Sequence, residues 1–210
     1  MTIAAPGEGG RSEATSGAGP GGAGRVRRVL VFTAKVLALL GVFAAAVWMN
    51  LYGAEAAGIE ETVRAWGYPG LFAMSALSGF NLLVPIPIVL FFPFFMEIGM
   101  HGGATLLTIA VGMTMGDLVG FLLGSIGRQV VELPDGKVLR MLRDLRNRPW
   151  LPYAVLFAYA SFAPFPNEIL VIPMAFLGFS VVGIFASTFL GNLIFNTIAA
   201  LGLTGVFGGG

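Results

Sequence analysis

The chain has 210 residues, of which 56% are hydrophobic and only 11% are charged, and its mean hydropathy is +0.85. Such a chain lacks the polar surface of a water-soluble globule, so the composition predicts an integral membrane protein. A net charge of +1 without a basic, aromatic-interleaved patch excludes a nucleic-acid binder, and the absence of cysteine excludes disulfides and thiol chemistry.

The sequence of the N-terminal part predicts a tail followed by a membrane anchor. Residues 1–24 are rich in Gly, Ala, Pro and Ser and cannot bury enough apolar area to fold, so we expect a disordered cytoplasmic tail. Residues 25–51 open on three arginines and continue as an apolar run whose only charge is Lys35, long enough to cross about 30 Å of hydrocarbon. A cleaved signal peptide ending near residues 54–57 is the alternative, but the long tail and long run favour an uncleaved anchor.

The charges of two polar segments predict the topology. Residues 52–67, an outer interfacial segment, are net negative, whereas residues 128–150 carry six basic residues against three acidic ones. Because cytoplasmic loops carry an excess of Lys and Arg, we expect residues 128–150 and the N-terminus on the cytoplasmic side of the cell membrane. The mostly apolar residues 68–127 between these segments must then cross the membrane an odd number of times.

Prolines divide each of the two remaining apolar stretches. In residues 68–127 three crossings would leave strained half-length helices, so we expect a re-entrant hairpin over 68–102 and one transmembrane helix over 103–127. Residues 151–210 repeat this pattern, with a proline-broken hairpin and then a transmembrane helix over 181–206. The residues that we expect to shape the two hairpins are Pro85, Pro87 and Pro93, and Pro164, Pro166 and Pro173.

The two stretches form an internal repeat with a shift of 79 residues. The matched pairs are Pro85 with Pro164, Pro87 with Pro166, Gly99 with Gly178, Gly112 with Gly191, and Asp117 with Asn196, while Pro93 and Pro173 match after a slip of one residue. Since the hairpins start from opposite sides, the repeats would be inverted about an in-plane axis, as in many transporters. Two unrelated kinked helix pairs are the alternative.

Small residues recur every fourth position in both predicted crossing helices. They are Gly112, Gly116, Gly120 and Gly124 in the first and Gly183, Ser187 and Gly191 in the second. Such strips let helix backbones approach closely, which explains the glycines as plain packing. Packing does not explain Asp117 beside the first strip or Asn192 and Asn196 beside the second, so these three are candidates for a substrate or proton path.

Glu168 is the strongest candidate for function, because it is the only acid between Leu151 and the C-terminus and lies in a proline-broken apolar segment next to Asn167. A charge there costs about 2.5 to 3.5 kcal/mol on insertion scales, so it is expected to face a cavity or free backbone N–H groups, or to hold a proton. An interfacial helix cap is the alternative. Glu97 and His101 are more typical of the outer interface.

Residues 135–148 predict an amphipathic helix that Pro149 ends. Val138, Met141, Leu142 and Leu145 would form its apolar face, and the opposite face would carry Arg140, Arg143 and Arg146. Such a helix lies in the headgroup layer and attracts anionic lipid, although anchoring the topology alone would also account for it. We find no nucleophile elbow, phosphate loop or metal-ligand cluster, and we expect no catalytic residues, no metal, no cofactor and no enzyme.

These motifs together resemble the DedA superfamily, also called the VTT or SNARE-associated Golgi protein family. The resemblance covers roughly residues 66 to 206 and rests on the first hairpin's Pro85-Ile-Pro87, on Gly127-Arg128, on Pro164-Phe-Pro166-Asn167-Glu168 with Pro173, and on Gly191-Asn192. It implies two inverted re-entrant hairpins and movement of lipids between leaflets: carrier-lipid and phosphatidylethanolamine recycling in bacterial members, phospholipid scrambling in eukaryotic ones.

The residues that we expect along a substrate or proton path are Glu168, Asp117, Asn167, Asn192, Asn196 and Arg128. The resemblance implies roles for two of them. Glu168 matches an acidic hairpin position, and Arg128 matches the arginine that closes the first repeat. Where many members carry an acidic residue after the first hairpin's prolines, this chain has Ile88 and Val89, and no arginine follows the second hairpin's prolines. These departures weigh against proton coupling and against an anionic carrier as substrate.

The sequence thus predicts an all-α integral membrane protein with three transmembrane helices and two inverted re-entrant hairpins. We expect a flippase or scramblase for phospholipid or polyprenyl-phosphate carrier lipid, with membrane lipids as partners, protons as a further candidate, and a homo-oligomer as one assembly. A proton-coupled transporter of a small solute or cation, using Glu168 and Asp117, is the first alternative. A non-transporting membrane scaffold is the second.

Overall fold

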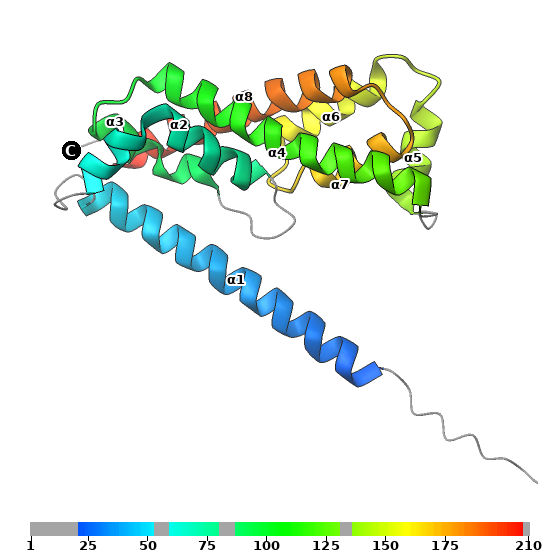
Figure 1. The fold of residues 1–210 in the computed structure, drawn as a ribbon, viewed down its shortest axis with the longest axis horizontal. Helices are drawn as coiled ribbons and strands as arrows, with labels where there is room; N and C mark the ends of the chain where they lie inside the picture. The colour runs from blue at the N-terminus through cyan, green and yellow to red at the C-terminus, as the bar shows by residue number, and fades with distance from the viewer. Residues whose placement is uncertain (1–20, 53–58, 80–86, 131–135, 208–210) are drawn as a thin grey trace, which may run out of the picture. The chain divides into compact units, whose positions relative to one another are not determined.

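The computed structural model describes residues 21–52, 59–79, 87–130 and 136–207, and all regular secondary structure in these ranges is helical (Figure 1). The chain forms two units, residues 1–36 and 37–210, and α1 (Gly21–Tyr52) runs through both. The other elements are α2 (Ile59–Gly79), the 3-10 helix η1 (Ile88–Phe91), α3 (Phe92–Glu97), α4 (Gly102–Val130), α5 (Lys137–Leu145), α6 (Leu151–Phe162), α7 (Glu168–Phe176) and α8 (Val181–Phe207). Pro85 and the predicted tail up to residue 20 lie outside the described residues.

Three helices are long and apolar enough to cross a membrane. The apolar stretches are Val29–Tyr52 in α1, Gly102–Arg128 in α4 and Val181–Val206 in α8, with 24, 27 and 26 residues. At a rise of about 1.5 Å per residue each exceeds the roughly 30 Å of a bilayer's hydrocarbon core. In the described residues the predicted all-helical fold is therefore confirmed, with three apolar helices long enough to span a membrane. One boundary was wrong, since α1 begins at Gly21, inside the predicted tail, because the hydrogen-bond ladder of the apolar run continues upstream.

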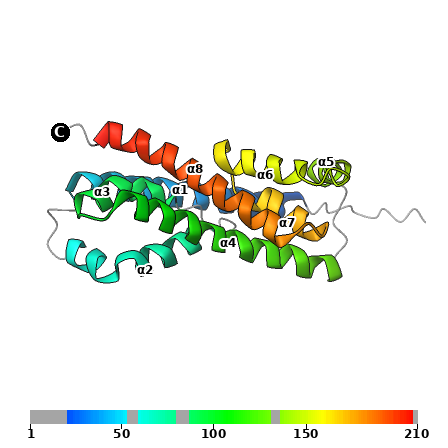
Figure 2. The same cartoon turned by 90° about the horizontal axis from the view of Figure 1, so that it is seen from above.

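In residues 37–210 the two long helices α4 and α8 pack against each other, and two shorter helix pairs pack around them (Figure 2). We call α2 with η1 and α3 the first helix pair, and α6 with α7 the second helix pair. The first member of each pair packs on the long helix that follows it in sequence, α2 on α4 and α6 on α8. The second member packs on the other long helix, α7 on α4, and η1 and α3 on α8.

Glycines, which have no side chain, make these close packings possible. A Cβ atom on Gly112 of α4 would meet the Ser75 side chain of α2, and a Cβ atom on Gly191 of α8 would meet Ala160 of α6. The two predicted strips of small residues therefore do bring helix backbones together, as the spacing indicated. The first strip contacts α2 at Gly112 and α7 at Gly120 and Gly124, and the second contacts α6 at Gly183 and Gly191.

In the second helix pair the helix is interrupted. α6 ends at Phe162, α7 begins at Glu168, and the residues between them, which include Pro164 and Pro166, are not helical. The prediction that Pro173 also holds this segment open was wrong, because Pro173 lies inside α7. An interior proline removes the hydrogen bond to the carbonyl four residues earlier and crowds that carbonyl, and packing of α7 on α4 offsets this cost.

In the first helix pair, Pro87 precedes η1 and Pro93 lies in the first turn of α3. The missing N–H of a proline costs little in a first turn, so Pro93 starts a helix where we expected it to interrupt one. α2 carries its own kink, because Gly67 has a φ of 48° and Pro69 follows two residues later. This kink falls at the predicted boundary between the interfacial segment and the hairpin.

The basic helix α5 differs from its prediction in the face that it buries. Its buried residues are Leu139 and Leu142, which pack towards α6 and α7, while Met141 is 40% exposed. The prediction that Met141 lies on the apolar face was therefore wrong. Because the protein covers the face that carries Leu142, this face is not available to lipid, whereas Arg140, Arg143 and Arg146 are exposed.

Candidate functional site

A cluster of polar side chains lies buried where α4, α7 and α8 meet. Asp117 of α4 and Asn192 of α8 are each 2% exposed, and Asn167, which immediately precedes α7, is 8% exposed. Asn167 and Asn192 follow Asp117 by 50 and 75 residues in the sequence, so only the packing of the three helices brings the side chains together. The polar residues that the small-residue strips left unexplained thus form one site.

The Asp117 carboxylate is the centre of this polar cluster. Its Oδ2 atom accepts hydrogen bonds from Asn192 Nδ2 at 2.9 Å and from Asn167 Nδ2 at 3.1 Å. Asn167 Nδ2 also donates to Asn192 Oδ1 at 3.0 Å. A carboxylate held by two amide donors is far less costly to bury than an unpartnered one, because each donor replaces part of the lost hydration.

Thr114 extends the cluster by one turn along α4. Its hydroxyl accepts a hydrogen bond from Asn192 Nδ2 at 3.2 Å and donates to the Ala110 carbonyl at 2.7 Å. We did not predict Thr114 from the sequence, although a signal exists. It precedes Asp117 by three residues, a spacing that places two side chains on the same face of a helix.

The non-helical segment between α6 and α7 positions Asn167 in the cluster. Pro166 has no N–H to continue a helix, and its carbonyl instead accepts bonds from the Ile169 N–H at 3.3 Å and from the Tyr159 hydroxyl at 3.4 Å. α7 then starts, and the Asn167 carbonyl accepts from the N–H groups of Leu170 and Val171, both at 2.9 Å. The proline-broken segment therefore ends with an amide side chain that points at Asp117.

Glu168, the strongest candidate from the sequence, is buried next to this cluster with 4% of its surface exposed. It occupies the first turn of α7, where the helix dipole favours a negative charge. Its side chain lies against Gly120 of α4, since a Cβ atom at that glycine would be 3.1 Å from Glu168 Cγ. Two acidic residues from different helices are thus buried in the same part of the molecule.

Asn196 lies one turn beyond Asn192 and is 1% exposed. Its Nδ2 atom donates to the Asn192 carbonyl at 2.6 Å and approaches Met113 Sδ of α4 at 3.3 Å. Asn196 therefore extends the contact between α8 and α4, but a weak sulfur acceptor takes the place that a carboxylate occupies at Asp117.

Arg128 is not part of this site. It lies eleven residues after Asp117 on α4, about 16 Å along the helix axis, and its side chain is exposed. Its guanidinium lies against Gly178, in the turn between α7 and α8, because a Cβ atom on that glycine would be 2.6 Å from Arg128 Nη1. The structure therefore brings together five of the predicted path residues, Asp117, Asn167, Glu168, Asn192 and Asn196, and leaves Arg128 apart.

A cavity of about 490 Å³ lies elsewhere, beside the first helix pair, and its lining is apolar throughout. It is not the polar-lined, sideways-open groove that a lipid path would predict. Within the described residues, no group of three or more His, Cys, Asp or Glu side chains could hold a metal ion. In the part of the chain that the structure describes, the polar cluster is a predicted site whose members bond directly to one another.

Comparisons of the chain with models of known protein families, with curated proteins and with solved structures find no match.

Proposed function

We propose that the protein is a lipid transporter, a flippase or scramblase that moves phospholipid or polyprenyl-phosphate carrier lipid between the leaflets of the cell membrane. The observation that carries this proposal is the buried polar cluster at the crossing of two long apolar helices with a proline-broken segment. Ionisable residues within membrane spans are expensive to bury and mark substrate or ion paths. Transporters commonly build such sites near the bilayer midplane from broken helices.

The proposal includes two re-entrant hairpins formed by the two helix pairs. α6 has 12 residues and α7 has 9, which correspond to about 18 Å and about 14 Å of helix. Each alone is too short for roughly 30 Å of hydrocarbon, which fits a chain that enters the bilayer and returns to the same side. At the tip Pro164 and Phe165 are exposed, and Tyr159 satisfies part of the non-helical backbone: its carbonyl accepts from the Ala163 N–H, and its hydroxyl donates to the Pro166 carbonyl.

An inverted repeat with a shift of 79 residues is supported by the ends of the two pairs. After the first pair, the N–H groups of Ile98, Gly99 and Met100 donate to the carbonyls of Phe94, Met96 and Phe95, in that order. After the second pair, the N–H groups of Leu177, Gly178 and Phe179 donate in the same order to the carbonyls of Pro173, Ala175 and Met174. Each bond of the first set becomes a bond of the second when 79 is added to both partners. Gly99 and Gly178 also share a positive φ, 87° and 79°, which only glycine adopts readily.

The crossing of α4 and α8 supports a pseudo-twofold axis. The same shift converts Met113 into Asn192 and Asp117 into Asn196. A twofold axis therefore exchanges the contact between Asn192 and Asp117 with the contact between Met113 and Asn196, and both contacts exist. The repeat is symmetric in its backbone and asymmetric in its chemistry, since only one of the two contacts contains an acid.

In the proposed mechanism the lipid headgroup passes the polar cluster while the hydrocarbon tails remain in the bilayer. Glu168 can bind a cationic headgroup amine or take up and release a proton, and Asp117 exchanges its amide donors for the headgroup. Movement of the second hairpin opens the path, because Asn167 ties its tip to α4 and α8 through side-chain bonds only. The resemblance to the DedA superfamily agrees with this class of activity.

The proposed orientation places the N-terminus and α5 in the cytoplasm and the turn around His101 outside. The exposed arginines of α5 would then lie at the cytoplasmic leaflet, where anionic headgroups concentrate. Arg140, Arg143 and Arg146 are the residues that we assign to headgroup contact.

Leaflet exchange in liposomes reconstituted with the purified full chain tests this function. Fluorescent phospholipids and labelled polyprenyl phosphate are placed in both leaflets, and the fraction that dithionite or an enzyme reaches from outside is followed with time. We expect exchange above that of protein-free liposomes for at least one lipid, with no leak of a trapped soluble dye. Proton or solute flux without lipid exchange would favour the solute transporter, and the absence of all three would favour the scaffold.

A further inference from the structure

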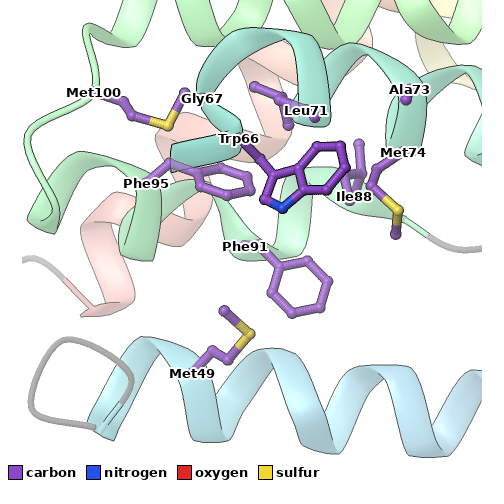
Figure 3. A pocket seen from close by; sticks show the side chains of 11 residues that line it. Met49, Trp66, Gly67, Leu71, Ala73, Met74, Ile88, Phe91, Phe95 and Met100 are labelled. Atoms are coloured by element: carbon purple, nitrogen blue, oxygen red, sulfur yellow. The ribbon is translucent and has the colours of Figure 1, made fainter. Parts of the chain in front are cut away.

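The apolar cavity beside the first helix pair lies between the C-terminal end of α1, α2, η1 and α3 (Figure 3). Met49 lines it from α1, Trp66 and Met74 from α2, and Phe91 from η1, with Leu71 and Met100 among the other lining residues. Its volume of about 490 Å³ falls within the range of small-molecule sites. Long, flexible methionines suit an apolar occupant that changes its shape.

Water is a poor occupant for this cavity. A buried water needs two to four polar partners, and apolar cavities instead stay dry and take up apolar molecules. Every lining residue is apolar or glycine, and the cavity adjoins the end of the apolar stretch Val29–Tyr52. The apolar material that surrounds a membrane-spanning helix is the hydrocarbon of lipid.

An amide side chain fixes the wall of the cavity that α1 provides. Asn50 Nδ2 donates to the Leu90 carbonyl at 2.7 Å, and Asn50 Oδ1 accepts from the Phe94 N–H at 2.8 Å. Leu90 and Phe94 are four residues apart, so these are the two groups that would bond to each other in a regular α-helix. The Asn50 amide is inserted between them at the junction of η1 and α3.

This inserted amide sets the spacing of the cavity, because Met49 and Phe91, which line it, are the direct neighbours of Asn50 and Leu90. The cavity is therefore a built feature that depends on α1 and not a packing fault of the first helix pair. We did not predict Asn50 from the sequence, where it reads as one polar residue at the end of an apolar run.

The end of the cavity near Gly67 carries residues typical of the membrane–water interface. Trp66 is 69% exposed, and the neighbouring Tyr68 hydroxyl accepts a hydrogen bond from the His101 N–H at 3.0 Å. Trp and Tyr gather at the headgroup level of bilayers. A lipid whose headgroup lay at this level would direct one of its chains into the cavity.

We propose that this cavity is a binding site for one acyl chain of a glycerophospholipid, with the headgroup at the level of Trp66 and Tyr68. The site is separate from the polar cluster, and it stands whether or not the protein moves lipid. Its volume suits a single acyl chain and not a long polyprenyl chain. A phospholipid held here wedges α1 against the first helix pair.

Photocrosslinking of the full chain in liposomes tests this site. The probe is a phosphatidylcholine with a diazirine in one acyl chain, and modified residues are mapped by mass spectrometry. We expect adducts concentrated on the cavity residues, Met49, Met74 and Phe91 above all, relative to the exposed lipid-facing residues of α8. Lipid exchange is measured separately on the same preparations, so a failure of this site and a failure of the proposed function remain distinguishable.

Two variants fill the cavity from opposite walls, Ala73→Phe on α2 and Met49→Phe on α1. Either should lower the cavity adducts by about tenfold, since the acyl chain must displace the new ring. Ala158→Phe, at an exposed position of α6, is the matched control and should leave them unchanged. Thermal unfolding verifies that each variant is folded.

Three results would overturn the proposal. The first is labelling of the cavity residues no stronger than that of the exposed α8 surface. The second is stronger labelling there by a photoreactive polyprenyl phosphate than by the phosphatidylcholine probe. The third is cavity labelling that persists in both filled variants.

Discussion

The two helix pairs share a backbone plan and carry opposite chemistry. The first pair contains the aromatic run Phe91 to Phe95, is tied to α1 by Asn50 and lines an open apolar cavity together with α1. The second pair starts its returning helix with Asn167 and Glu168, which lie buried beside the polar cluster. One pair thus lines an apolar cavity and the other supplies a polar site, and under the proposed function we expect the second pair to move while the first is held.

The test with the largest expected effect asks whether the two helix pairs start from opposite sides of the membrane. The chain lacks cysteine, so His101→Cys and Arg146→Cys each introduce a single thiol. We expect a membrane-impermeant maleimide added to intact cells to label the first variant only, and the second only after lysis, because basic loops stay in the cytoplasm. Labelling of both from the same side would end the inverted-repeat interpretation.

The next test compares acids of the two pairs. Glu168→Gln keeps the size and hydrogen bonding of the buried side chain but deletes its charge, so lipid exchange should fall at least about tenfold, which is roughly 1.4 kcal/mol in the barrier. Glu97→Gln, an exposed acid at the end of the first pair, is the matched control and should exchange lipid at the parent rate. If folded Glu168→Gln keeps the parent rate, Glu168 is a helix cap and the polar cluster is structural.

The third test uses the two asparagines of α8. Asn192→Ala removes a donor from buried Asp117 and a partner from Asn167 and Thr114, so it should lower the free energy of unfolding by about 1 to 3 kcal/mol. Asn196→Ala loses a sulfur contact and an intrahelical bond, and should cost about 1 kcal/mol or less. Unfolding in detergent measures both. Equal losses would show that the acid does not distinguish the two symmetry-related contacts.

The smallest effect is expected at the anchor of the first pair. Asn50→Leu removes the inserted amide, but the Leu90 carbonyl and the Phe94 N–H can then bond to each other, so the net cost should be about 1 kcal/mol. Hydrogen exchange at the Phe94 amide should nevertheless become faster, because the replacement bond to Leu90 lacks the tie to α1 and this junction then opens more often. Thr33→Leu, at an exposed position of the same helix, serves as the control. Unchanged exchange at Phe94 would contradict the role of Asn50 as the tie.

The sequence by itself determined the helical class of fold and the approximate bounds of the three long apolar helices, because apolar length and proline positions act locally along the chain. It also predicted the break at Pro164 and Pro166, and it paired Gly99 with Gly178, which both have a positive φ. It erred where a neighbouring helix decides the outcome: on α5 Leu142 is buried as predicted, but Leu139 is buried too and Met141 is exposed, and Pro173 is accommodated inside a packed helix.

Only the tertiary structure decided which polar residues meet. Asp117 was a candidate on its own, but its partners lie 50 and 75 residues away and depend on the register at which α4, α7 and α8 cross. Asn50 contributes nothing recognisable in its own helix, because its amide acts on backbone groups 40 and 44 residues later. A hydrogen bond requires its two atoms within about 3 Å. Sequence periodicity gives the face of each helix, but the depth and angle at which faces meet follow from packing.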